Sequence, residues 1–240
     1  MQEPQVLKSA VTKFQFPKLE SKIFFISAAL FIYVLIFFQG FFSVSLIPII
    51  FRVDILTNIS PAYLLVWGMA RVFIILPLTF ALIVSQKNAL KQFFFSLNNT
   101  KKVIQIAFWS TFAFTILGFI FYPYFLNRPA IGWESFLSYF PYFILYSIGN
   151  GFVEEAFFRG ALLSKFSEWW GNEIGNNIQA LFFALIHLVV IPFNPSATYF
   201  ILLTFILGYF FGYITLKTKS IFPAIILHIV ADLFFAVSLF

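Results

Sequence analysis

Long apolar segments set the limits on what this chain can fold into. Seven of them follow one another along the sequence, at residues 23–50, 62–85, 103–125, 135–163, 174–191, 197–216 and 221–239. A helix needs about 20 apolar residues to cross the hydrocarbon core of a bilayer, and an open sheet edge is not tolerated there. The pattern predicts an all-α, polytopic membrane helix bundle with about seven transmembrane helices, or eight if one long segment is divided.

The low content of charged residues supports a chain that is membrane-embedded throughout. Only 10% of the residues are charged and 61% are hydrophobic, whereas a soluble domain is about 25% charged. We predict a cytoplasmic tail at residues 1–22, a single transmembrane domain at residues 23–240, and a short interfacial helix at residues 88–98. Because the chain has no cysteine, disulfides and cysteine-bound metal sites are excluded.

Basic residues predict which side of the membrane each loop occupies. If the N-terminus is cytoplasmic, the inner loops contain Lys8, Lys13, Lys18, Lys22, Lys87, Lys91, Lys101, Lys102, Lys165, Lys217 and Lys219, and the outer loops only Arg52 and Arg128. This asymmetry favours a cytoplasmic N-terminus. It also explains the net charge of +6, so we predict no nucleic-acid partner. Lysine-rich inner loops and the lack of cysteine fit a bacterial plasma membrane.

Three charged side chains lie inside the fourth apolar segment. These are Glu154, Glu155 and Arg159, and a charge at the bilayer centre costs about 2.5–3.5 kcal/mol on insertion scales. Glu155 and Arg159 are four residues apart, so they share a helix face and are expected to pair. Glu154 points about 100° away, because an α-helix has about 3.6 residues per turn, and is left for another partner. We predict a functional site that faces the bundle interior.

Both histidines of the chain also lie within apolar segments. His187 is in the fifth segment, and His228 is in the seventh, four residues before Asp232. His228 and Asp232 therefore share a helix face, and Phe183 is expected to pack beside the ring of His187. At about 1.5 Å per residue, His228, Glu154 and His187 are expected about 12, 15 and 17 Å from the inner membrane surface. The three side chains are predicted to meet at one level of the membrane.

These groups favour the hydrolysis of an amide. A carboxylate and an imidazole on facing helices can hold a water molecule and take its proton, and a second imidazole can donate to the developing oxyanion. The same groups would also serve a proton-coupled transporter, although the chain shows no repeat of the kind that many transporters have. Each pair alone is explained by packing, but three such pairs on separate segments are not easily explained in that way.

Three motifs in order carry a resemblance to a known family. Glu154-Glu155-x-x-x-Arg159, Phe183-x-x-x-His187 and His228-x-x-x-Asp232 resemble the motifs of the CPBP family of membrane proteins. This family, also called Abi, contains CAAX prenyl proteases and bacteriocin-processing proteins. Residues 207–218 also resemble it. The resemblance covers about residues 145–235, within a CPBP-like core at about residues 135–240, whereas residues 1–130 share only their hydrophobicity with the family.

The resemblance implies an intramembrane endopeptidase that cuts a membrane-associated substrate, either a prenylated CAAX-type protein or a bacteriocin-like peptide. The roles that it implies are activation of water by Glu154 and His187, an oxyanion site at His228 and Asp232, and support from Glu155 and Arg159. Its partners would be membrane lipid and a peptide or lipidated protein substrate. The alternative within the same fold is a non-catalytic immunity or scaffold protein.

Two details of the site follow from the motif residues. An ionised carboxylate cannot donate a hydrogen bond, so we predict that Asp232 accepts the N–H of His228 and orients its ring. The resemblance implies a glutamate-type site without a metal cofactor. The alternative is zinc held by the two histidines with Glu154 and Asp232, although the chain has no His-Glu-x-x-His motif.

Overall fold

The fold is built from helices throughout the part of the chain that the structure describes. The computed structural model describes residues 19–41, 61–86, 92–97, 100–126, 133–188 and 197–238. Every regular element in these ranges is helical, which confirms the all-α bundle. The predicted cytoplasmic tail lies almost entirely outside the described residues, as do the outer loops that contain Arg52 and Arg128.

In the described part of the chain, seven helical segments match the seven apolar segments of the sequence. They are α1 (Leu19–Phe41), a rod of α4 (Pro61–Ala70), η2 (Arg71–Ile75) and α5 (Leu76–Val84), α7 (Thr100–Leu126), a rod of α8 (Trp133–Glu155), η3 (Ala156–Leu163) and α9 (Ser164–Trp170), α10 (Asn172–Leu185), α11 (Ala197–Thr218) and α12 (Phe222–Ser238). The predicted interfacial helix at residues 88–98 falls partly outside the described residues. In residues 92–97 the chain makes a turn, with Phe94 at a φ of 63°.

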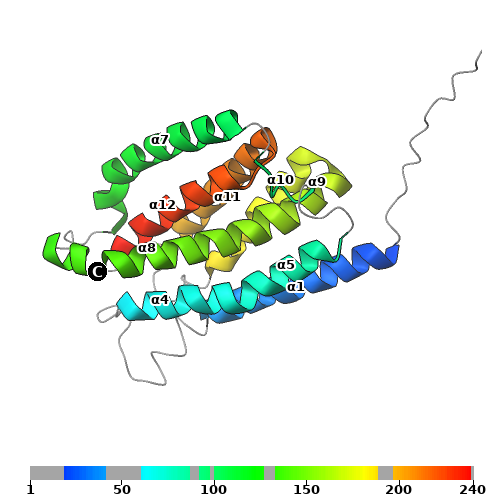
Figure 1. Cartoon of the computed structure of the whole chain (residues 1–240), viewed down its shortest axis with the longest axis horizontal. Coiled ribbons are helices and arrows are strands. Elements are labelled where there is room, and N and C mark those ends of the chain that lie inside the picture. Colours follow the sequence, from blue (N-terminus) through cyan, green and yellow to red (C-terminus); the bar gives the residue numbers. More distant parts are fainter. Residues whose placement is uncertain are drawn as a thin grey trace, which may run out of the picture.

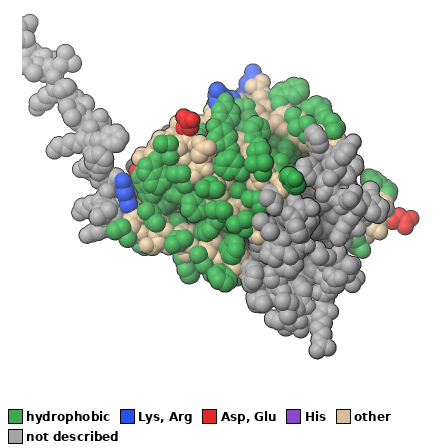
Figure 2. Space-filling view, turned by 180° about the vertical axis from the view of Figure 1, so that it is seen from behind, with side chains coloured by type: hydrophobic (Ala, Val, Ile, Leu, Met, Phe, Trp, Pro, Cys, Tyr) green, Lys and Arg blue, Asp and Glu red, His purple; other side chains and the backbone are tan. Residues whose placement is uncertain are grey.

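The outer surface of the bundle suits a lipid environment. Ser21–Gly40, Leu64–Val84 and Tyr199–Thr218 are each long and apolar enough to cross a membrane, and Phe222–Phe234 is a shorter apolar helix. Figure 2 shows a face on which hydrophobic side chains predominate and charged side chains lie near the edges. In water such a surface would be costly at about 25 cal/mol per Å². The protein is therefore an integral membrane protein.

The rod of α8, η3 and α9 lies at the centre of the bundle. Figure 1 shows α8 between the α1, α4 and α5 helices on one side and α12 on the other, with α7 beyond α12. α8 contacts α4 and α12, and η3 contacts α5, α10 and α11. All eight residues of η3 are buried. The stretch from Glu154 to Arg159, which contains all three charges, is thus buried throughout.

Two π-helical stretches lie next to the polar residues of the spans. η3 begins directly after Glu155 and includes Arg159, and η2 begins at Arg71. η2 ends shortly before Pro77, which has no N–H to donate to the preceding turn. A π-helical bulge changes the direction of the side chains that follow it and is frequent at functional sites. Both rods are thus locally irregular at their buried charges.

Small residues allow helices α10 and α11 to approach closely. A Cβ atom added at Gly208 would lie 3.0 Å from the ring of Phe183, and one at Gly212 would lie 1.9 Å from Oδ1 of Asn176. Gly208 and Gly212 form a small-xxx-small pair, a spacing that lets another helix approach closely. α11 is thereby brought against the helix that carries Phe183 and His187.

Candidate active site

Glu155 and Arg159 form the buried ion pair that their spacing predicts. Nη1 of Arg159 lies 2.7 Å from Oε1 of Glu155, and neither side chain is exposed. Nη2 of Arg159 donates to the carbonyl oxygen of Gly208 over 3.2 Å. The guanidinium carbon lies 4.3 Å from the ring centre of Phe183, a cation–π distance. Arg159 thus links η3 to both α10 and α11.

Glu154 points to the other side of the rod and has a different partner. Its Oε1 atom forms an ion pair with Nη1 of Arg71, in the rod of α4, η2 and α5. Its Oε2 atom is buried and has no hydrogen-bond partner among the described residues. This oxygen lies 3.6 Å from Nε2 of His228. One oxygen of the carboxylate is therefore held by a cation, while the other is left for a small molecule or a substrate group.

His228 is held between three carboxylates. Its Nδ1 atom donates to Oε1 of Glu155 over 2.6 Å. Its Nε2 atom lies 3.6 Å from Oε2 of Glu154 and 3.6 Å from Oδ1 of Asp232. The predicted shared face of His228 and Asp232 is present, but 3.6 Å exceeds hydrogen-bond length. In this structure, Glu155 rather than Asp232 makes the hydrogen bond that orients the imidazole.

His187 joins the same cluster through Phe183. Its Nδ1 atom donates to the carbonyl oxygen of Phe183 over 2.8 Å, so Nε2 is the ring nitrogen that remains for a ligand. The ring of Phe183 lies 5.0 Å from that of His187, as the sequence predicts, and 5.7 Å from that of His228. The ring of Phe183 thus lies in contact with both imidazoles.

Two functional candidates escaped the sequence analysis. Neither Arg71, which lies in the second apolar segment, nor Asn150 was given a role there. Nη1 of Arg71 donates to Oδ1 of Asn150, and Nδ2 of Asn150 donates to Oδ2 of Asp232 over 2.8 Å. A lone arginine in an apolar segment needs a buried counter-charge, and this signal could have identified Arg71. Asn150 lies four residues before Glu154, on the same helix face.

The surroundings of Glu154 do not favour a divalent cation. The guanidinium of Arg71 already binds one carboxylate oxygen, and its positive charge opposes a second cation nearby. Among the described residues, no group of three or more His, Asp or Glu side chains is arranged to hold a metal ion. The zinc alternative gains no support from this geometry.

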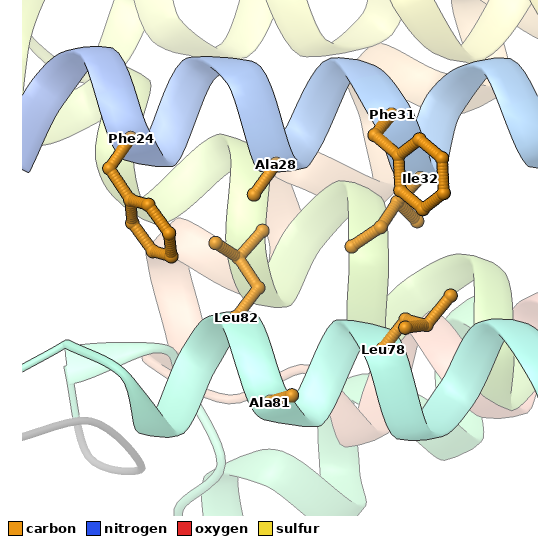
Figure 3. A pocket seen from close by; sticks show the side chains of 7 residues that line it. All are labelled: Phe24, Ala28, Phe31, Ile32, Leu78, Ala81 and Leu82. Carbon is orange, nitrogen blue, oxygen red and sulfur yellow. The ribbon is translucent and has the colours of Figure 1, made fainter.

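Two apolar cavities lie apart from the buried charges. Figure 3 shows one of about 200 Å³ between α1 and α5, lined by Phe24, Ala28, Phe31, Ile32, Leu78, Ala81 and Leu82. A second, of about 320 Å³, lies between α10 and α11 and includes Leu188, the neighbour of His187. Neither is lined by a group that does acid–base chemistry.

Comparison with known protein families agrees with the geometry. Residues 136–234 match a family described as Rce1-like, type II CAAX prenyl endopeptidase Rce1-like. No curated protein and no solved structure matches the chain. The matched residues include the whole of the three motifs and leave out Arg71. The match agrees with the resemblance to the CPBP family: over residues 136–234 the chain is similar to the Rce1-like type II CAAX prenyl endopeptidases.

Proposed function

We propose that this protein is a glutamate-type intramembrane endopeptidase that hydrolyses a peptide bond of a membrane-associated protein. The observation that carries the proposal is the free Oε2 atom of Glu154, buried and 3.6 Å from Nε2 of His228. An unpartnered carboxylate oxygen is costly inside a protein unless something binds it. A water molecule or a substrate group at this oxygen would remove that cost.

The reaction would begin with the removal of a proton from water. Oε2 of Glu154 accepts the proton while the water oxygen bonds to the carbonyl carbon of the scissile peptide. Nε2 of His187 is free to orient that water, because Nδ1 is committed to the carbonyl of Phe183. Collapse of the tetrahedral intermediate breaks the C–N bond, and Glu154 returns the proton to the leaving amine.

His228 and Asp232 would serve the oxyanion side of the reaction. A proton on Nε2 of His228 is donated to the carbonyl oxygen as its negative charge develops. The ring is in a fixed orientation for this donation because Nδ1 is bound to Glu155. Asp232 lies on the same helix face as His228 and accepts a hydrogen bond from Asn150. It therefore lies beside Nε2 of His228 and leaves Nδ1 to Glu155.

The second apolar cavity, between α10 and α11, favours a substrate that has an apolar segment. This cavity is lined by aliphatic and aromatic side chains and includes Leu188, which directly follows His187. A prenyl chain or an apolar peptide gains about 0.8 kcal/mol for each buried CH₂ group. We therefore propose that the substrate is a prenylated CAAX-type protein or an apolar peptide, cut within the membrane. We propose the bacterial plasma membrane as the location of the protein.

The test is cleavage of a panel of prenylated and unprenylated peptides by purified protein in vesicles. We expect cleavage by the wild type and its loss in Glu154→Gln and His187→Ala. The matched control is Glu134→Gln, an exposed carboxylate in the first turn of α8, which should cleave normally. Intact peptides with a folded wild type would contradict the proposal. Proton flux in such vesicles would instead favour the transporter, and binding without turnover the scaffold protein.

A further inference from the structure

The N-terminal half of the chain contributes a buried cation to the candidate active site. Arg71 is 5% exposed and begins the π-helical stretch η2. Its Nη1 atom donates to both Glu154 and Asn150, and its Nε atom donates to Oε1 of Gln39 over 3.3 Å. Its guanidinium carbon lies 5.4 Å from the ring centre of Trp67. Contacts from α1, α4 and α8 thus hold the guanidinium in one position.

The contacts of Arg71 reach both carboxylates that face Nε2 of His228. One is Glu154, which it binds directly. The other is Asp232, which it reaches through Asn150. Oδ1 of Asn150 accepts from Arg71, and Nδ2 of Asn150 donates to Oδ2 of Asp232. Since Glu154 and Asp232 each lie 3.6 Å from Nε2, the two carboxylates face a single nitrogen. A single side chain from outside the motif region therefore fixes both of them.

The charges of the cluster require this cation. Three carboxylates, Glu154, Glu155 and Asp232, lie around His228, and Arg159 is committed to Glu155. Without Arg71, Glu154 would be a buried carboxylate with no guanidinium partner, which a low-dielectric interior does not tolerate. Nε2 of His228 lies 3.6 Å from Oε2, so Glu154 would turn toward this donor. Such a turn would remove the free oxygen that the hydrolysis needs.

We propose that Arg71 is a positioning residue of the endopeptidase, one that holds Oε1 of Glu154 so that Oε2 remains free to receive the proton of water. Through the same Nη1 atom it holds Asn150, which in turn donates to Asp232. This inference rests on the proposed function and extends it to residues outside 136–234, the part that matches the family. The N-terminal helices therefore complete the active site in addition to covering it.

The test compares Arg71→Gln, Arg71→Lys and Glu154→Gln in full-length protein in vesicles, with a cleaved peptide as substrate. Removal of the guanidinium misplaces a reacting group, and a misplacement of about 1 Å is associated with a loss of about 100-fold in rate. We expect Arg71→Gln to lower kcat by about 100-fold while KM stays within about threefold. Arg71→Lys keeps the charge but lacks the planar fork, so it should recover part of kcat.

A matched control and a second measurement separate positioning from folding. Thr79→Val removes a buried hydroxyl with no hydrogen-bond partner among the described residues, on the same rod, and should leave kcat unchanged. The double variant Arg71→Gln/Glu154→Gln should have a Tm closer to that of the wild type than either single variant has, because neither buried charge is then left alone. The double variant should still not cleave the peptide.

Each outcome decides between the two proposals. If Glu154→Gln abolishes cleavage but Arg71→Gln keeps the kcat of the wild type, the positioning role is wrong and the proposed function stands. If Arg71→Lys is as inactive as Arg71→Gln and the Tm losses of the single variants simply add, Arg71 does not act through Glu154. If Glu154→Gln cleaves normally or the wild type cleaves no peptide, the proposed function fails and this inference fails with it.

Discussion

Oε1 of Glu155 lies 2.6 Å from Nδ1 of His228 and 2.7 Å from Nη1 of Arg159. A single carboxylate oxygen therefore joins α12 to η3. The contact to Arg159 is local, between residues four positions apart, whereas the contact to His228 spans 73 positions of the sequence. Glu155 thus connects an ion pair within one helical rod to α12, which packs against that rod.

The Glu155–Arg159 pair should be necessary for stability. Glu155→Gln leaves the fully buried Arg159 without a counter-charge, and removal of one partner of a buried pair costs about 3–5 kcal/mol. Denaturant or thermal unfolding in detergent measures the loss. The control is Glu168→Gln, which breaks a partly exposed pair with Lys165 and should cost about 1 kcal/mol or less. Equal losses in the two variants would contradict the expected difference.

Asp232 should tolerate asparagine but not alanine. Its Oδ2 atom accepts from Nδ2 of Asn150 over 2.8 Å, and the amide oxygen of an asparagine accepts the same bond. We expect Asp232→Asn to cleave peptide at nearly the rate of the wild type, and Asp232→Ala to lose about 100-fold in kcat. Steady-state cleavage rates check this. Equal activity of the two variants would remove Asp232 from the mechanism.

Gly212 should resist substitution because α10 passes too close. The Cβ of an alanine there would lie 1.9 Å from Oδ1 of Asn176 and 2.6 Å from Nε2 of Gln179, which are hydrogen-bonded to each other. We expect Gly212→Ala to lower the free energy of unfolding by about 1–3 kcal/mol, the usual cost of overpacking. The control is Gly149→Ala, whose closest contact would be a methyl group of Val72 at 3.1 Å. A smaller loss at Gly212 than at Gly149 would refute the close approach.

Chelators should leave cleavage intact. The guanidinium of Arg71 already compensates the charge of Glu154, so the site gains little from a divalent cation. We expect EDTA and 1,10-phenanthroline to leave the cleavage rate of the wild type unchanged, and elemental analysis to find less than one zinc ion per chain. Loss of activity on chelation, with recovery on addition of zinc, would favour the zinc site instead.

Helical periodicity was sufficient to predict which site residues on the same helix lie next to each other. Residues four positions apart share a helix face, so the ion pair of Glu155 with Arg159 and the common face of His228 and Asp232 were predicted correctly. The contacts between site residues on different helices were not predictable in this way. Asp232 was expected to orient His228 by accepting its N–H, but the packing of α12 on α8 brings Glu155 within hydrogen-bond distance of Nδ1. The rotation of one helix against another is set by side-chain packing, which periodicity does not specify.

Two properties of this protein were readable from the sequence alone, namely the helical bundle and the segments on which its charges lie, because hydrophobicity and i,i+4 spacing are properties of single helices. The partner of Glu154 was decided only by the tertiary structure. Arg71 lies 83 positions away in a segment with no motif, and its contact with Glu154 depends on the docking of η2 against α8. A buried charge must find its counter-charge, but which one it finds depends on which helices pack together.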